Sequence, residues 1–329
     1  MATEDPFGPI RSLMSSKRIQ MDAGEFHAAV NEVFHAFEAP VYDEVHQDMW
    51  RSLPRQFELL ANELVDNDSE TIVPQISVLD VGCGTGLATD LLLRSPLGKF
   101  VNEVTLLDPS TEMLELAMHR SRDWKIDVQP RVGVLCDLPE DATYEFVIAC
   151  SVLHHIPDLA AFCGELTRIT PTGGHLLHIH DPNGDISQDR EWEERALRLK
   201  RSLAPRTSKD RFSLPHIKGK FWSMFPWLRK KSYLDRVNEE LRRRGLISSN
   251  LSSEEIWRIT DLRVYDDIGI QISHLKDLLA GFRLINHRSY GFFGRLWSDL
   301  PKELRPEEER MIEDGRKDGA FIGALWQRD

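Results

Sequence analysis

A glycine-rich segment that directly follows an apolar run is the clearest chemical signal in the sequence. Residues 78–86 read VLDVGCGTG, in which Gly82, Gly84 and Gly86 come after a run with the composition of a buried strand. Glycines between a strand and a helix let a ligand approach the backbone closely, and the free N–H groups at the start of the helix attract negative charge. The segment therefore predicts a site for a nucleotide-like cofactor.

The spacing of these glycines separates two kinds of nucleotide site. The dinucleotide-binding fingerprint is G-x-G-x-x-G, and Leu87 stands where its third glycine would be. The segment reads G-x-G-x-G instead, with Asp80 two residues ahead of the first glycine. The dinucleotide fingerprint is thus absent, while a purely structural glycine turn stays open on these residues alone.

Carboxylates follow the next apolar runs of the chain. Asp108 ends the run in LLDPSTEML, and Asp137 lies in CDLP after a presumed third strand. A carboxylate in the position of Asp108 can accept hydrogen bonds from both hydroxyls of a ribose, each contributing on the order of 1.5 to 3 kcal/mol before desolvation. Taken singly, either acid could instead cap a helix.

The glycine loop resembles motif I of the class I S-adenosylmethionine (SAM)-dependent methyltransferases, in their small-molecule branch. The resemblance continues in order through Asp108, Asp137 and YEFVIACSVLHHIPD at 144–158, and it covers about residues 70–183 closely and 270–329 more loosely. It implies that Asp108 binds the ribose and that Asp137, with the backbone of Leu138, binds the adenine. The expected SAM-binding residues are Tyr42, Asp80, Gly82, Cys83, Gly84, Gly86, Asp108, Pro109, Met113, Cys136, Asp137, Leu138 and Cys150.

Tyr42 belongs to this set through a short match. Tyr42-Asp43 resembles a Tyr-Asp element that lies over the methionine end of SAM in related small-molecule methyltransferases.

Histidines follow the fourth and fifth apolar runs, where a parallel sheet binds its ligands. SAM already carries an activated methyl group, so the protein has chiefly to position the acceptor, but a hydroxyl acceptor also needs a base. His154 and His155 are the first candidates for this base, and a role in capping a helix or shaping the pocket is the alternative. His178 and His180 are two residues apart on a strand and are expected to share one of its faces, which would permit a metal site. Two histidines on a buried strand more often form hydrogen bonds. No metal is expected.

The elements that must position these residues follow from the apolar periodicity. Short apolar runs at 76–81, 104–108, 145–150 and 175–180 alternate with helical stretches, which is typical of a parallel sheet covered on both faces. Two further strands are expected near 284–290 and 320–326. The sequence thus predicts a doubly wound, seven-stranded, mostly parallel α/β sheet with an N-terminal helical cap and a helical insertion after the fifth strand. The predicted segments are a cap at 1–70, a SAM-binding core at 71–183, an insertion at 184–265 and the completion of the core at 266–329.

The insertion is basic and aromatic inside an acidic protein. Residues 195–244 carry 16 Lys and Arg against 4 Asp and Glu, which leaves the rest of the chain at −24. Phe212, Phe221, Trp222, Phe225, Trp227 and Tyr233 alternate with cations in its centre. A lid over the SAM pocket, an RNA-binding face and an amphipathic membrane-surface patch could each use this pattern, as could a simple helical subdomain. An anionic partner at 195–244 is therefore one expectation.

Composition and charge restrict the kind of substrate and the cellular location that can be expected. The net charge of −12 and the absence of the [DNS]PP[YF] motif make nucleic acid an unfavourable substrate, and the place of that motif reads CSVLHH. No apolar run is long enough to cross a bilayer, the N-terminus has no secretion signal pattern, and the four cysteines form no CxxC pair. A cytoplasmic protein with reduced cysteines is expected.

The sequence thus predicts methyl transfer from SAM to an oxygen, nitrogen or carbon atom of a small, hydrophobic or conjugated metabolite. Two alternatives stay open: an RNA or carrier-bound acyl substrate, and SAM binding without methyl transfer. The acceptor atom, the substrate and the oligomeric state do not follow from the sequence.

Overall fold

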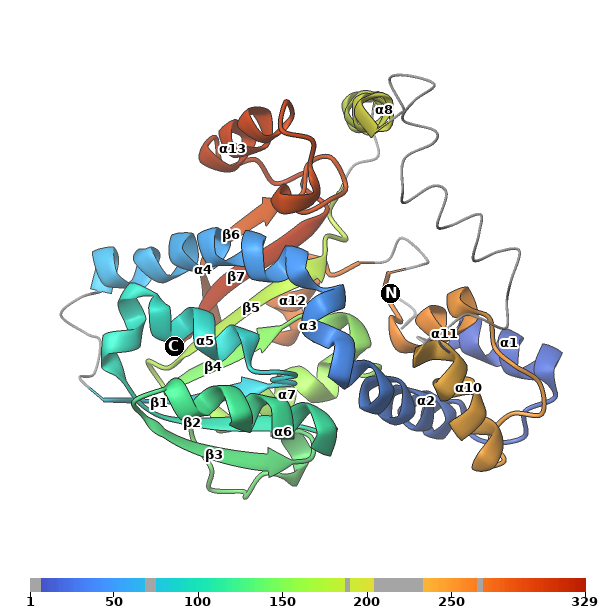
Figure 1. Ribbon diagram of the computed structural model, residues 1–329. Helices are drawn as coiled ribbons and strands as arrows, with labels where there is room; N and C mark the ends of the chain where they lie inside the picture. Colours follow the sequence, from blue (N-terminus) through green and yellow to red (C-terminus); the bar gives the residue numbers. More distant parts are fainter. Residues whose placement is uncertain (1–6, 69–74, 187–189, 204–232, 265–268) are drawn as a thin grey trace.

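The computed structural model describes residues 7–68, 75–186, 190–203, 233–264 and 269–329 (Figure 1). Its centre is a seven-stranded sheet in the order β3-β2-β1-β4-β5-β7-β6. The strands are β1 Ile76–Val81, β2 Val101–Asp108, β3 Asp127–Val132, β4 Phe146–Cys150, β5 His175–Pro182, β6 Phe282–Tyr290 and β7 Phe321–Arg328. Neighbouring strands are parallel except for β7, which runs antiparallel to β5 and β6. The predicted fold class is confirmed.

Helices cover both faces of this sheet. On one face lie α4 (Gln47–Asp68), α5 (Leu87–Arg94) and α6 (Thr111–Arg120), and on the other lie α7 (Leu159–Ile169) and α12 (Ile272–Leu278). Alternate side chains of a strand point to opposite faces, so a strand covered on both sides has to be apolar throughout. This requirement explains why the strands appear in the sequence as continuous apolar runs.

The order of the strands creates a crevice at one edge of the sheet. From β1 the chain moves outward through β2 to β3, and it then returns to β4 on the other side of β1. The loops after β1 and β4 therefore lead away from each other at the carboxyl edge, which is where open α/β sheets bind ligands.

Two segments that lie far apart in the sequence form one helical bundle. α1 (Gly8–Lys17) and α2 (Ala23–Glu38) pack against α10 (Tyr233–Arg243) and α11 (Ser253–Thr260) (Figure 1). Their apolar side chains make a core separate from the two sheet faces, including Ile10, Phe26, Val30, Val237, Leu241 and Ile256. We call these four helices the cap bundle. The sequence predicts each helical pattern, and the tertiary structure joins them.

The chain passes from the cap bundle to the sheet through a short connection. The 3-10 turn η1 (Ala39–Val41) and α3 (Tyr42–Val45) link α2 to α4. α4 then packs on the sheet through the apolar positions that the sequence identifies, with Leu53, Phe57 and Leu60 buried. Tyr42 and its neighbours are thereby held between the cap bundle and the core.

Helix α8 (Arg190–Leu203) packs on the core beside α13 (Arg305–Glu313) and not on the cap bundle. Several arginines described in the insertion are paired with carboxylates: Arg195 with Glu191 and Asp318, Arg198 with Glu307, and Arg243 and Arg244 with Glu240. The positive charge of these arginines is therefore partly balanced within the chain, and the prediction of an anionic partner gains no support from the described residues.

The aromatic and basic stretch from Phe212 to Lys231 lies outside the described residues. Among the helices of the described ranges, none combines the length and the apolar character that crossing a membrane requires.

Candidate active site

The glycine loop after β1 has a backbone that only glycine adopts easily. Gly82, Gly84 and Gly86 have φ values of 59°, 53° and 85°. A Cβ on Gly82 would lie 2.8 Å from the side chain of Val152, in the loop after β4, whereas a Cβ on Gly84 would meet no atom within 4 Å. The lack of a Cβ at Gly82 therefore lets the loops after β1 and β4 pack closely, and the lack of one at Gly84 leaves space beside the crevice.

Asp108, at the end of β2, holds this loop in place. Its Oδ2 accepts a hydrogen bond of 2.9 Å from the amide of Gly84, and its Oδ1 accepts one of 2.8 Å from the amide of Ser110. Burial raises the pKa of this carboxyl group, and the two backbone hydrogen bonds oppose that shift. A carboxylate oxygen can accept more than one hydrogen bond, so each oxygen retains capacity for a ribose hydroxyl.

Asp80 lies deeper and supports the helix that follows the loop. Its Oδ2 accepts hydrogen bonds from the amide (3.1 Å) and the hydroxyl (2.6 Å) of Thr89 in α5. Burial raises the pKa of Asp80 to about 7, although the bonds from Thr89 lower it. Its Oδ1 has no hydrogen-bond partner among the described residues, and such a buried acceptor fits a ligand donor or an ordered water.

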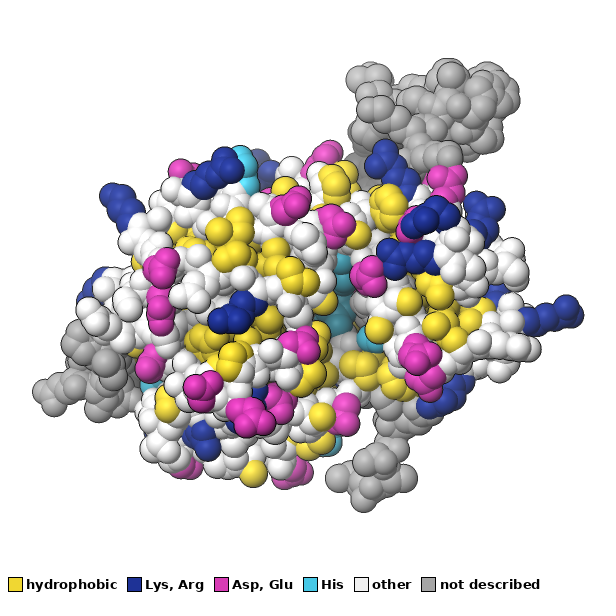
Figure 2. Space-filling model, turned by 90° about the horizontal axis from the view of Figure 1, so that it is seen from below, with side chains coloured by type: hydrophobic (Ala, Val, Ile, Leu, Met, Phe, Trp, Pro, Cys, Tyr) yellow, Lys and Arg dark blue, Asp and Glu magenta, His cyan; other side chains and the backbone are white. Residues whose placement is uncertain are grey.

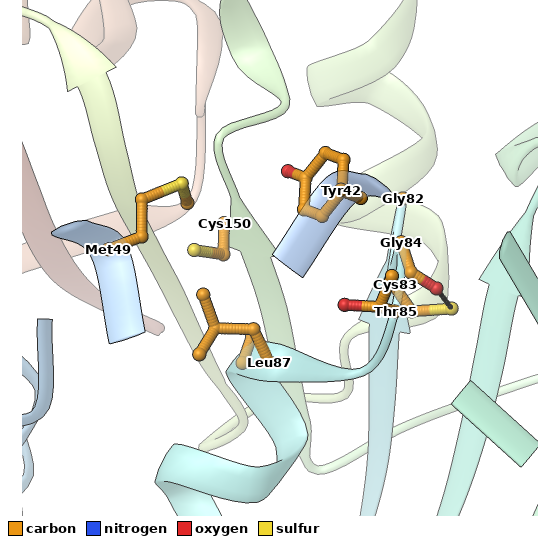
Figure 3. A pocket seen from close by; sticks show the side chains of 9 residues that line it. Tyr42, Met49, Gly82, Cys83, Gly84, Thr85, Leu87 and Cys150 are labelled. Carbon is orange, nitrogen blue, oxygen red and sulfur yellow. Dashed lines mark hydrogen bonds between the residues drawn. The ribbon is translucent and has the colours of Figure 1, made fainter. Parts of the chain in front are cut away.

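A small pocket opens between the glycine loop and the connection to α4 (Figure 3). Figure 3 shows the ring of Tyr42 above the loop, with the side chains of Met49, Leu87 and Cys150 around the opening. The complete lining is Tyr42, Met49, Gly82, Cys83, Gly84, Thr85, Leu87, Ala88 and Cys150. Tyr42, Cys83 and Cys150, which come from three separate motifs in the sequence, are thus brought together.

Asp43, next to Tyr42, links the connection between α2 and α4 to the glycine loop through hydrogen bonds. Its Oδ1 accepts hydrogen bonds from the Thr85 hydroxyl (2.8 Å) and the indole N–H of Trp50 (3.2 Å). Arg120 of α6 forms an ion pair with Asp43, donates to the carbonyl of Thr85 and stacks over Trp50 at 4.3 Å. These four side chains form what we call the loop clamp.

The other predicted cofactor residues lie around the ends of β2 and β3. Pro109 is exposed, and Met113 is buried in the first turn of α6. The loop that carries Asp137 reaches the end of β2, because the amide of Gly133 donates to the carbonyl of Asp108 (3.1 Å). Asp137 itself accepts from the amide of Val134 (2.9 Å). Cys136 is exposed and Leu138 is buried.

His154 is oriented by a carboxylate from the next strand. Its Nδ1 lies 2.9 Å from Oδ1 of Asp181, which also accepts a hydrogen bond of 3.2 Å from the His154 amide. Asp181 is fully buried at the end of β5. Burial alone would raise the pKa of Asp181, but the hydrogen bond from His154 and the neighbouring His178 lower it. An ionised Asp181 only accepts hydrogen bonds, so the Nδ1 of His154 is the donor.

His155 points towards the cap bundle. Its Nδ1 lies 2.8 Å from the carbonyl of Thr260 and 3.5 Å from Oδ1 of Asp261, both at the end of α11. Its ring packs edge-on against His35 of α2, with centroids 5.5 Å apart. Burial and the nearby His154 lower the pKa of His155 well below its ordinary value, so this imidazole is neutral.

The expectation that His178 and His180 share one face of the strand is wrong. The pairing of β5 with β7 shifts between Ile179 and Asp181, and His180 has φ 68°. His178 stacks on Trp326 in the core of one sheet face, whereas His180 stacks on Phe321, which packs with the core of the other face. The bulge inserts an extra residue, which turns the strand over and separates the two rings.

Sequence reasoning missed a polar cluster at the end of α2. Glu38 is buried, and its carboxylate lies 3.5 Å from Nδ1 of His35 and 3.2 Å from Nε2 of His46. Burial would raise the pKa of Glu38, but the hydrogen bonds from the two histidines lower it to about 2. The ring of His46 packs on Tyr42 at 4.4 Å. The available signal was an acidic residue at the end of the apolar face of a predicted helix.

Comparison with known proteins agrees with this arrangement. A family model described as "Methyltransferase domain" matches residues 79–178, which run from β1 to β5. The chain is 29% identical over 182 residues to the mitochondrial ubiquinone biosynthesis O-methyltransferase of Homo sapiens, covering 51% of this chain and 46% of that protein. It is 34% identical over 97 residues to the ubiquinone biosynthesis O-methyltransferase of Methylocella silvestris, covering 28% of this chain and 36% of that protein. The matches thus span less than half the length of these relatives.

Solved structures of low identity align over more of the chain. A putative sarcosine dimethylglycine methyltransferase from Galdieria sulphuraria is 16% identical, with 83% of this chain and 84% of that chain covered and a TM-score of 0.46. Geranyl diphosphate C-methyltransferase from Streptomyces coelicolor A3(2) is 15% identical, with 84% and 78% covered and a TM-score of 0.40.

The family match falls on the glycine loop, on Asp108 and on the histidine segment after β4, which are the parts of the chain that build the crevice. The sheet has the seven strands, mostly parallel, that the sequence predicts. Residues 79–178 therefore match a methyltransferase domain of the class I, SAM-dependent kind.

Proposed function

We propose that this protein transfers the methyl group of SAM to a hydroxyl oxygen of a small molecule. The observation that carries the proposal is the hydrogen bond of 2.9 Å between His154 and Asp181. This pair lies at the carboxyl edge of the sheet, one strand away from the glycine loop. A neutral imidazole with a free Nε2 is a competent proton acceptor near neutral pH.

In this proposal the cofactor lies along the carboxyl ends of β1, β2 and β4. Asp108 accepts hydrogen bonds from the ribose hydroxyls, and Asp137 and Leu138 bind the adenine. Gly82, Gly84 and Gly86, supported by Asp80, leave room for the methionine portion. The remaining predicted residues, Cys83, Pro109, Met113, Cys136, Cys150 and Tyr42, border the same space.

The reaction requires one displacement and one proton transfer. A lone pair of the acceptor oxygen attacks the methyl carbon, the carbon–sulfur bond breaks, and S-adenosylhomocysteine (SAH) leaves with the electron pair. The acceptor proton moves to Nε2 of His154, and the imidazolium that forms is stabilised by the carboxylate of Asp181. No covalent intermediate with the protein is needed.

The relatives support oxygen as the acceptor atom, because both are named as ubiquinone biosynthesis O-methyltransferases. The division of the chain follows the same proposal. In this proposal, residues 71–183 and 266–329 form the SAM-binding core, and the cap bundle covers the acceptor. We place the protein in the cytoplasm on its sequence alone.

The test is SAH formation by the full chain with a panel of hydroxylated aromatic compounds and their amino and O-methylated counterparts. We expect SAH only with free hydroxyl groups, and turnover reduced by about 10²- to 10⁴-fold in His154→Ala, with SAM affinity retained. An equally active His154→Ala enzyme would refute the role of His154. SAM binding without SAH formation for any acceptor would refute methyl transfer.

A further inference from the structure

Three potential metal ligands meet where the core and the cap bundle face each other. His154 and His155 come from the 3-10 turn η5 (Leu153–His155) after β4, and Asp261 follows α11. One ligand atom from each lies within 4.8 Å of the other two. Figure 2 shows histidine side chains in a hollow between two lobes of the molecule, and the side chains of His155 and Asp261 are each about a quarter exposed.

Each of the two histidine rings is held by a hydrogen bond at its Nδ1. The Nδ1 of His154 donates to the carboxylate of Asp181 (2.9 Å), and the Nδ1 of His155 donates to the carbonyl of Thr260 (2.8 Å). Proteins commonly fix a metal-binding histidine in this way, with one ring nitrogen bonded to a carboxylate or carbonyl and the other left to bind the metal. Two adjacent histidines that share this pattern are more specific than a histidine pair alone.

The cluster also suits a cation because one of its members is a carboxylate. The Asp261 side chain is about a quarter exposed, so an ion can reach it from solvent.

We propose that His154, His155 and Asp261 bind one divalent transition metal ion of the Zn²⁺ type. Two imidazoles and one carboxylate form a common ligand set of catalytic zinc, which keeps a further position for water or a substrate oxygen. Because Asp261 belongs to the end of the cap bundle, the ion would also fasten the bundle to the core.

The inference rests on the proposed function in one respect, namely that the acceptor is a hydroxyl group in this site. A metal lowers the pKa of an oxygen bound to it. With a metal bound, His154 would serve as a ligand oriented by Asp181, and the metal would take over the activation of the acceptor hydroxyl. In the metal-free protein, Nε2 of His154 accepts the proton itself.

The test is a titration of the metal-stripped full chain with CoCl₂, followed by the visible absorption of bound Co²⁺, and with ZnCl₂ by calorimetry. We expect one ion per chain, with affinity at least tenfold lower in His155→Ala and Asp261→Asn. Asp181→Asn, which leaves all three ligands in place, should weaken binding by about 10- to 100-fold. His274→Ala, an exposed histidine on α12, is the matched control and should bind as the wild type does.

SAM affinity, measured on each variant, shows whether its fold is intact. Wild-type protein that binds no Co²⁺, or a folded His155→Ala variant that binds it as tightly as wild type, would overturn the metal site. Turnover that survives chelation, together with no Co²⁺ binding, would remove the metal and leave the proposed function standing. Co²⁺ binding without SAH formation from any hydroxylated acceptor would support the metal site and refute the proposed function.

Discussion

The amide of Gly84 donates a hydrogen bond of 2.9 Å to Oδ2 of Asp108. The carboxylate that we propose to bind the ribose thus also shapes the glycine loop from the neighbouring strand. Gly84 has a φ of 53°, a conformation that glycine adopts without the steric cost of a Cβ. The loop and the acid after β2 therefore form one structural unit, although 24 residues separate them in the sequence.

Replacing Asp108 should affect cofactor binding more than folding. Asp108→Ala removes both proposed ribose contacts and leaves the Gly84 amide without its acceptor, so we expect SAH affinity to fall at least tenfold and unfolding free energy to fall by about 1 to 3 kcal/mol. Calorimetric titration and urea unfolding measure the two effects. Ser110→Ala, which removes the hydroxyl that caps α6, is the control: it should lower stability by about 1 kcal/mol and leave SAH affinity unchanged. Undiminished affinity in Asp108→Ala would contradict the assignment.

Gly82 and Gly84 offer a matched pair of substitutions. Alanine at either position must adopt a positive φ, at about 1 to 2 kcal/mol. Only at Gly82 does the new Cβ also meet Val152, at 2.8 Å, which adds about 1 to 3 kcal/mol of overpacking. We expect Gly82→Ala to lower thermal stability more and Gly84→Ala to lower SAH affinity more. Equal effects of the two variants on both properties would show that Gly84 does not face the cofactor.

The loop clamp makes cofactor affinity depend on the N-terminal connection. Arg120→Ala removes its ion pair with Asp43 and its contact with Trp50. Because the glycine loop is then held less firmly, we expect unfolding free energy to fall by about 1 to 2 kcal/mol and SAH to bind several-fold more weakly. Arg122→Ala, at an exposed position two residues away, should change neither quantity. An Arg120→Ala protein with wild-type affinity would separate the clamp from cofactor binding.

Glu38 and His35 should stabilise the folded protein most strongly within a limited pH range. The pKa of Glu38 is lowered from 4.5 to about 2, so its contribution is present above pH 4.5 and is lost as the pH falls through about 2. The pKa of His35 is raised above 6.5 by its hydrogen bond to Glu38, against the effect of burial. Its contribution is therefore present below pH 6.5 and is lost as the pH rises through the raised value. The pair is strongest between pH 4.5 and 6.5.

Within that window, Glu38→Gln should lower the unfolding free energy by about 2 to 4 kcal/mol, with smaller differences on both sides. Urea unfolding of both proteins across a pH series measures the difference. Glu25→Gln, at an exposed position in the first turn of the same helix, should give a small difference that does not follow this window. A pH-independent difference for Glu38→Gln would mean that its histidine partners carry no charge in the folded protein.

Local sequence determined the sheet and the position of the cofactor loop. The strands at 76–81 and 146–150 could be predicted because burial on both faces demands a continuous apolar run, and that demand acts on neighbours in the chain. Gly82, Gly84 and Asp108 could be predicted because a strand-to-helix turn and an acid at a strand end are local patterns. The same holds for the helices at 23–38 and 233–243, whose apolar faces repeat with the helical period.

Tertiary structure alone decided which of these groups act together. Asp181 orients His154 because β4 and β5 are paired, and a bulge at 179–181 carries His180 away from His178. Asp261 reaches His155 across 106 residues only because α11 packs against α2 in the cap bundle. Such contacts depend on register and on packing between distant segments, and no local pattern encodes them. The sequence by itself therefore determined the cofactor and the fold, whereas the structure decided which side chains meet in the proposed acceptor site.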